Sequence, residues 1–290
     1  VFLDPSYEGD GLKIKEIIKR GPFAVKKNEV TPGIIIEKID GTDIKAGEDY
    51  NALLDGKAGK NIRLTIKNAK GKRFDLTIKA ISQGAQQELL YKRWVDRNRA
   101  IVDSVSHGRI AYVHVKAMNS ESFRTVYSEL LSEKNRTKDA VIVDERHNGG
   151  GWLHDDLCTL LSGKQYQEFV PHGKVVGKDP FNKWTKPSCV LICEDDYSNG
   201  HGFPWVYKEL GIGKLIGAPV AGTMTAVWWE TLMDRSLVFG IPQVGCRDMR
   251  GTFGENTTLQ PDIEVYNSPE DYITGHDTQL IRAVEEMMKK

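Results

Sequence analysis

The first third of the chain alternates apolar and polar residues in short runs, the pattern of half-buried β-strands. These runs cover residues 12–17, 34–39, 62–66 and 74–78. Tight-turn signals at 40–41 and 68–72 separate the later runs, and a short helix is predicted at 49–54. We therefore predict a small β-rich domain over residues 1–82.

The pattern changes after residue 82. Residues 82–85 have the character of a linker, and 86–98 show the spacing of an amphipathic helix, so we predict a linker and helix over 83–99. Apolar runs then alternate with helical patterns. Strands are predicted at 109–115, 140–143 and 189–193, and helices at 120–132, 153–161, 202–210 and 277–288, with an irregular loop over 171–187. Strands alternating with helices predict an α/β domain over residues 100–290.

Ser198 lies between a predicted buried strand and a predicted helix. A strand fixes the position of such a residue, and a helix N-terminus offers unpaired N–H groups and a positive dipole end. Nucleophilic serines are often mounted in this way. A serine that only caps the helix is the alternative interpretation.

Two further segments carry candidate chemistry. Gly149, Gly150 and Gly151 follow the run 140–143, and their bare backbone suits the N–H donors of an oxyanion hole. A flexible turn or a phosphate-binding loop is the alternative, although no Gly-Lys-Ser/Thr of the Walker form follows. Glu255 lies in a third segment, which is predicted to be a loop. A solvent-exposed carboxylate without a catalytic role is the simpler interpretation of Glu255 in isolation.

Together these motifs resemble the tail-specific (carboxy-terminal processing) serine proteases, and most closely their tricorn-type branch. The matching stretches are residues 143–151, 197–200, 210–217, 253–265 and 269–272. Residues 32–44 and the helix-then-strand order after them are similar to a PDZ domain, which this family commonly carries. The resemblance implies a catalytic domain of the crotonase-like ββα superhelix type, preceded by the small PDZ-like domain.

The resemblance also implies roles for individual residues. Ser198 would attack a peptide carbonyl and form an acyl-enzyme, and Glu255 would be a catalytic carboxylate. The N–H of Asn199 and that of Gly150 or Gly151 would hold the oxyanion. No cofactor and no metal are implied.

The general base is not evident in this sequence. Ser–Lys members of the family carry a lysine after the nucleophile, and the corresponding stretch, residues 217–225, has none. The tricorn-type branch uses a histidine upstream of the PDZ domain, oriented by a serine and a glutamate, and we expect that this segment is missing here. Among the seven histidines, His201, His147 and His154 lie nearest the motifs, but a core or surface position is the simpler interpretation of each. The remaining histidines show no metal-ligand spacing.

Composition narrows the classes of partner. Lys plus Arg and Asp plus Glu number 40 each, so no overall basic field attracts nucleic acid. No apolar run has the length of a membrane span. The chain starts without an initiator Met and without a targeting segment, so we expect a processed product or a fragment, and the compartment stays open between extracytoplasmic and cytoplasmic.

The sequence thus predicts a serine endopeptidase that acts on peptides or unfolded proteins, with homo-oligomerisation left open. Two alternatives remain: a non-catalytic peptide-binding module, or a fragment that is inactive because its general base lies upstream. An acyl-CoA enzyme of the crotonase type is disfavoured, because that chemistry requires neither Ser198 nor a PDZ-like domain.

Overall fold

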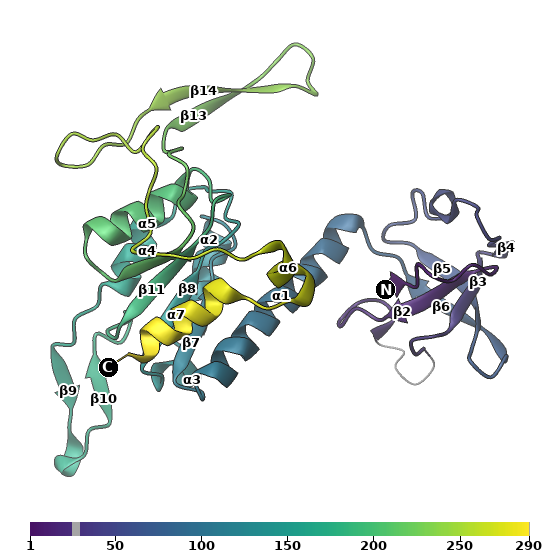
Figure 1. The fold of residues 1–290 in the computed structure, drawn as a ribbon, viewed down its shortest axis with the longest axis horizontal. Coiled ribbons are helices and arrows are strands. Elements are labelled where there is room, and N and C mark those ends of the chain that lie inside the picture. Colours follow the sequence, from purple (N-terminus) through teal and green to yellow (C-terminus); the bar gives the residue numbers. More distant parts are fainter. Residues whose placement is uncertain (25–29, 290) are drawn as a thin grey trace. The chain divides into compact units, whose positions relative to one another are not determined.

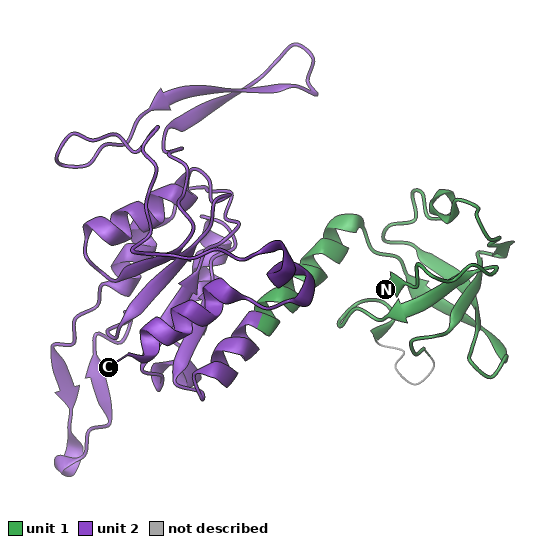
Figure 2. Cartoon of the chain, in the orientation of Figure 1, with its two compact units in different colours: residues 1–97 green, residues 98–290 purple. Residues whose placement is uncertain are grey.

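The computed structural model describes residues 1–24 and 30–289, and the chain divides into two compact units, residues 1–97 and 98–290 (Figure 2). Each unit has its own main β-sheet, and no sheet of the described residues runs through both. The division falls within the segment 83–99 that was predicted as linker and helix. No helix among the described residues has the length and apolar character needed to cross a membrane.

The first unit is an antiparallel sheet in the order β1-β2-β3-β5-β6, with β4 paired to β3. Its strands are β1 (Phe2–Leu3), β2 (Leu12–Glu16), β3 (Ile35–Ile39), β4 (Thr42–Asp43), β5 (Asn61–Lys67) and β6 (Arg73–Lys79). Alternate residues of the strands point inward, so Ile14, Ile36, Leu64 and Leu76 belong to one buried cluster. The helix predicted at 49–54 is only a four-residue 3₁₀ turn, η2 (Tyr50–Leu53).

The helix α1 (Gln83–Val105) is longer than predicted at both ends. It starts where a linker was expected, because the Ser82 hydroxyl accepts a hydrogen bond from the N–H of Ala85 at 3.2 Å and so caps the first turn. At its other end, Val102 is fully buried and Asn98 donates to the Tyr112 hydroxyl at 3.2 Å. Tertiary packing therefore extends this helix beyond its predicted end.

The second unit is built on a parallel sheet in the order β15-β12-β11-β8-β7. Its strands are β7 (Ile110–His114), β8 (Ala140–Asp144), β11 (Ser188–Ile192), β12 (Lys214–Gly217) and β15 (Ile263–Glu264). Every residue of β7, β8 and β11 is buried, which explains their continuous apolar runs. Because the strands are parallel, the loops after β8 and β11 leave the same edge of the sheet.

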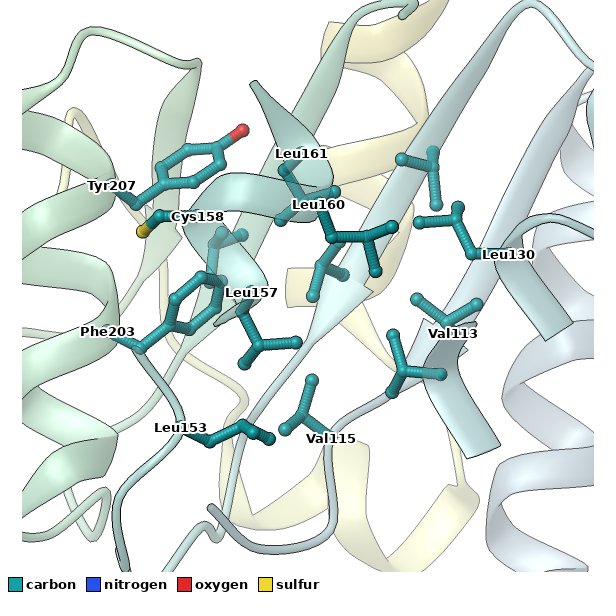
Figure 3. Close-up of a cluster of buried hydrophobic side chains, with 14 of the residues drawn as sticks. Val113, Val115, Leu130, Leu153, Leu157, Cys158, Leu160, Leu161, Phe203 and Tyr207 are labelled. Atoms are coloured by element: carbon teal, nitrogen blue, oxygen red, sulfur yellow. The ribbon is translucent and has the colours of Figure 1, made fainter. Parts of the chain in front are cut away.

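Helices cover both faces of this sheet (Figure 1). On one face lie α2 (Ser120–Leu130), α4 (His154–Leu161) and α5 (Asn199–Glu209), and on the other α7 (Thr278–Met288), which contacts β7, β8, β11 and β12. Figure 3 shows the core beneath the first set, which includes Val113 of β7 and Leu130, Leu157 and Phe203 of the three helices. The loops that carry the candidate site therefore begin at strands whose residues are buried on both faces of the sheet.

Several segments of the second unit differ from the prediction. The short helices α3 (Glu133–Arg136) and α6 (Pro269–Thr274) were not predicted. The region expected to be an irregular loop contains the 3₁₀ turn η3 (Pro171–Gly173) and the strand β10 (Gly177–Asp179), which pairs with β9 (Gln167–Phe169). A second hairpin joins β13 (Ala226–Thr231) to β14 (Val238–Val244). Most residues of these hairpins are exposed, so they lack the apolar alternation that identifies half-buried strands.

Candidate active site

Ser198 lies in the turn between β11 and α5, as its sequence position predicted. Its backbone has φ 55° and ψ −116°, a conformation that non-glycine residues rarely adopt. Such strain persists only where the surroundings enforce it, and it is common at catalytic sites. The helix α5 starts at Asn199 rather than at residue 202, so Ser198 is directly adjacent to the helix N-terminus.

The glycine loop after β8 passes against this turn. Gly150 has φ +93°, and a Cβ atom built on it would lie 2.7 Å from both the Ser198 Cβ and the Tyr197 carbonyl oxygen. Only glycine can therefore bring the loop backbone this close to Ser198. The predicted convergence of the glycine loop and the serine follows from this contact.

Asn148 joins the two loops. Its backbone carbonyl accepts from the N–H of Tyr197 at 2.9 Å, and its own N–H donates to Asp196 Oδ1 at 3.1 Å. Its side-chain oxygen accepts from the N–H of Gly150 at 2.9 Å, while its Nδ2 donates to the Val115 carbonyl at 2.8 Å. The side chain is fully buried, so these bonds fix the glycine loop against both β7 and the Ser198 turn.

The backbone N–H groups of the predicted oxyanion hole differ in their availability. That of Gly150 is donated to Asn148. In the described residues, no acceptor lies at the N–H of Gly151 or at that of Asn199. The Asn199 side chain serves a different purpose, since its Oδ1 accepts from the N–H groups of Leu153 and His154 at 2.7 and 3.1 Å and so caps α4.

A third segment, residues 223–227, completes the site. The hydroxyl of Thr223 accepts a hydrogen bond from the N–H of Ser198 at 3.1 Å. The carboxylate of Glu255 accepts from the N–H of Thr225 at 2.8 Å, which holds it beside the same segment. Thr223 was not singled out from the sequence, because nothing in its local pattern links it to a serine 25 residues earlier.

These segments enclose a cavity of about 630 Å³ within the second unit. Ser198, Asn199, Gly149, Gly151 and Glu255 all line it. The other lining residues are Trp152, Tyr197, Thr223, Met224, Thr225, Ala226, Val227, Trp229, Gly240 and Pro242. No histidine or lysine belongs to this lining in the part of the chain that the structure describes, so no side chain that commonly serves as a base for serine faces Ser198 there.

The three histidines near the motifs lie elsewhere. His201 is fully buried within α5, where its Nε2 lies 3.2 Å from the Thr257 carbonyl and its ring contacts Trp205. His154 Nδ1 lies 2.9 Å from the amide nitrogen of Asn199, and His147 Nδ1 lies 2.9 Å from Asp195 Oδ2. None of the three lines the cavity with Ser198.

Two buried carboxyl groups, those of Asp196 and Glu145, lie in the loops that follow β11 and β8. Asp196 accepts from the N–H groups of Cys193 and Asn148 at 2.8 and 3.1 Å, and burial raises its pKa to about 8. Glu145 is fully buried with no hydrogen-bond partner for either carboxyl oxygen among the described residues. Burial, and then the charges of Asp196 and Asp144, raise the pKa of Glu145 well above its ordinary value. Asp196 is therefore protonated at moderately acidic pH.

Comparison with known proteins places this geometry in a family. The model of "Peptidase family S41" matches residues 109–265, and that of "Tricorn protease PDZ domain" matches residues 7–83. The chain is 28% identical to the tricorn protease of Thermoplasma acidophilum over 259 residues, which cover 89% of this chain and 24% of that protein. It is also 28% identical to a tricorn protease homolog of Saccharolobus solfataricus over 289 residues, covering 98% of this chain and 26% of the relative.

A solved structure agrees with these sequence matches. The crystal structure of the tricorn protease superimposes with a TM-score of 0.80 at 26% identity, over 99% of this chain and 29% of that chain. The chain thus spans about a quarter of the length of the relatives it matches. The predicted recognition is confirmed: the chain belongs to peptidase family S41, as a tricorn-type member with a PDZ domain and a peptidase domain.

Proposed function

We propose that this chain carries the nucleophile and the oxyanion hole of a serine endopeptidase that hydrolyses peptide bonds in peptides or unfolded proteins. The observation that carries the proposal is the strained Ser198 at the start of α5, facing a cavity that it shares with Gly151, Asn199 and Glu255. A cavity of about 630 Å³ has the size of a site for a short peptide segment.

In the proposed reaction, Ser198 Oγ attacks the scissile carbonyl carbon while a general base removes the hydroxyl proton. The negative charge on the carbonyl oxygen is held by the N–H groups of Gly151 and Asn199, the latter at the positive end of the α5 dipole. Gly150, whose N–H is already donated to Asn148, has the separate role of letting the loop approach Ser198. The leaving amine takes the proton back from the base, and water then hydrolyses the acyl-enzyme.

We propose that the base comes from outside residues 1–290 and is oriented in part by Glu255. The absence of histidine and lysine from the described lining of the cavity supports this. We further propose that residues 1–82 form the PDZ-like domain and bind substrate peptides by strand addition, and that residues 100–290 form the catalytic core. The crotonase-like ββα superhelix stays part of the proposal, supported by the parallel sheet with helices on both faces.

Turnover of an unfolded protein substrate tests this function. Three proteins are compared at equal concentration: the 290-residue chain, the protein encoded by the whole gene, and that protein with Ser198→Ala. We expect only the second to be fully active, with the 290-residue chain at least about 10³-fold slower, since the groups of a catalytic triad act as a unit. Equal rates for the first two would place the base within residues 1–290. If all three are inert across varied peptides, the non-catalytic peptide-binding module becomes the better account.

A further inference from the structure

A second cluster of chemically active side chains lies outside the cavity, where the loops after β8 and β11 leave the sheet. His147 Nδ1 lies 2.9 Å from Asp195 Oδ2 and 3.8 Å from Cys193 Sγ. The Cys193 thiol in turn donates to Asp195 Oδ1 at 2.9 Å. His147 is 46 positions from Cys193 and 48 from Asp195 in sequence, so no ligand spacing reveals the cluster, and the apolar run around Cys193 predicts only a core residue.

The atoms have nearly the arrangement that a tetrahedral zinc ion requires. With ordinary Zn–N, Zn–S and Zn–O bond lengths, pairs of ligand atoms lie about 3.3–3.6 Å apart. Through a single carboxylate oxygen, Asp195 Oδ1, the separations are 3.2 Å to His147 Nδ1 and 2.9 Å to Cys193 Sγ, and those two atoms lie 3.8 Å apart. To accept an ion, these separations must change by about 0.2–0.7 Å, the largest change being between Cys193 Sγ and the carboxylate oxygen. One imidazole, one thiol and one carboxylate form a ligand set that favours Zn²⁺ over hard cations such as Mg²⁺ or Ca²⁺.

The surroundings of the cluster also suit a metal. The side chains of His147 and Asp195 are 49% and 64% exposed, so an ion can enter from solvent and keep a water in the fourth position. The backbone N–H of His147 donates to Cys193 Sγ at 3.2 Å and favours a thiolate, while burial and the charge of Asp196 raise the pKa of this thiol, so the positive charge of the ion itself must supply most of the stabilisation of the thiolate. His147 itself has φ 68°, a backbone conformation that non-glycine residues adopt uncommonly.

We propose that His147 Nδ1, Cys193 Sγ and an Asp195 carboxylate oxygen form a binding site for Zn²⁺. On binding, the Cys193 thiol releases one proton to the buffer, and the neutral imidazole of His147 carries its single proton on Nε2. The ion joins the loop that continues into Gly149 to the loop that continues into Ser198. It therefore fixes the two segments against each other, whether or not Ser198 is a nucleophile.

Cobalt substitution tests the site directly. The untagged 290-residue chain is first freed of metal with a chelator and then titrated with Co²⁺. We expect one equivalent to bind with the absorption of a tetrahedral thiolate complex, and one equivalent of Zn²⁺ to abolish that absorption. A wild-type chain that shows no thiolate-to-cobalt charge-transfer band would overturn the proposal without the use of any variant.

Variants with matched controls then identify the ligands. Cys193→Ser should remove the charge-transfer band, and Cys246→Ser, which changes a thiol outside the cluster, should retain it. His147→Asn should weaken Zn²⁺ binding at least about tenfold, and His107→Asn should not, although His107 has a comparable backbone φ of 51°. Asp195→Asn changes an exposed residue and should weaken binding in a folded chain. Unchanged affinity in all three cluster variants would contradict the assignment.

Discussion

Gly150 and Ser198 show at the scale of single residues how the site depends on the backbone. The serine adopts a strained φ of 55°, and the glycine contacts it with φ +93° and no room for a side chain. The sequence indicated both residues, because a serine after a buried strand and a run of glycines are local signals. Thr223 and Asn148 gave no comparable signal, since their roles arise only when the chain folds.

Gly150→Ala is expected to lower the free energy of unfolding by about 2–4 kcal/mol, because it adds both a clash and an unfavourable backbone angle. Gly149→Ala is the matched control: its Cβ would meet nothing within 4 Å, and we expect a change within about 0.5 kcal/mol. Urea unfolding of the two variants measures the difference. Equal stabilities would mean that the glycine loop does not approach Ser198 as described.

Asp196 is predicted to make stability depend on pH. Burial raises its pKa to about 8, so between about pH 4 and 8 the folded chain keeps a proton that the unfolded chain has lost. Unfolding then releases a proton, and the free energy of unfolding falls as the pH rises, by up to about 1.4 kcal/mol per pH unit for this group. Asp196→Asn should reduce this slope when stability is measured by urea unfolding at several pH values.

Asp103→Asn serves as the control for that measurement. The hydrogen bond from Lys138 lowers the pKa of Asp103 below its ordinary value, so the stability that this group contributes is constant at higher pH and is lost only as the pH falls below about 4. The Asp103→Asn variant should keep the wild-type slope between about pH 4 and 8. A wild-type slope in Asp196→Asn as well would show that Asp196 ionises normally in the folded chain.

At the scale of elements, a buried ion-pair network connects the end of β8 to the start of α7. Arg146 bonds to Asp144 at 2.8 Å and to Asp277 at 2.9 Å, and Asp277 also caps α7 by accepting from the N–H of Leu280. Asp144 is fully buried and also accepts from the Tyr112 hydroxyl at 2.8 Å. The network therefore holds the C-terminal helix against the strand that leads into the glycine loop.

Arg146→Met is expected to cost about 3–5 kcal/mol of stability, because it leaves the buried Asp144 without its counter-charge. Arg109→Met removes an ion pair of similar length, 2.7 Å to Asp139. Because the side chains of Arg109 and Asp139 are both exposed, we expect a loss of stability of at most about 1 kcal/mol. Thermal or urea unfolding of both variants compares the two pairs. Similar losses would contradict the role given to the buried network.

The elements also show what the sequence could and could not predict. The strands β8 and β11 and the helices α2 and α7 follow from their apolar patterns, because burial imposes those patterns. The hairpin β13–β14 was missed because its strands are largely exposed, and Trp229 on β13 lines the cavity all the same. The early start of α5 at Asn199 depends on the strained Ser198 turn, which no propensity encodes.

At the scale of the whole molecule, the chain belongs to a peptidase family, yet no residue of the described cavity lining is a histidine or lysine. We therefore propose that Ser198 is a nucleophile that residues 1–290 position but do not activate. A small base supplied in the buffer should increase the rate at which Ser198 reacts, since general-base catalysis requires only a proton acceptor within reach of the hydroxyl.

The most direct test is to treat the 290-residue chain with a fluorophosphonate, with and without added imidazole, and to locate the adduct by tandem mass spectrometry. The account predicts one phosphonyl group, on Ser198, that forms faster with imidazole and is absent from Ser198→Ala. An adduct on a different serine, or modification of Ser198 at a rate that imidazole does not change, would contradict it.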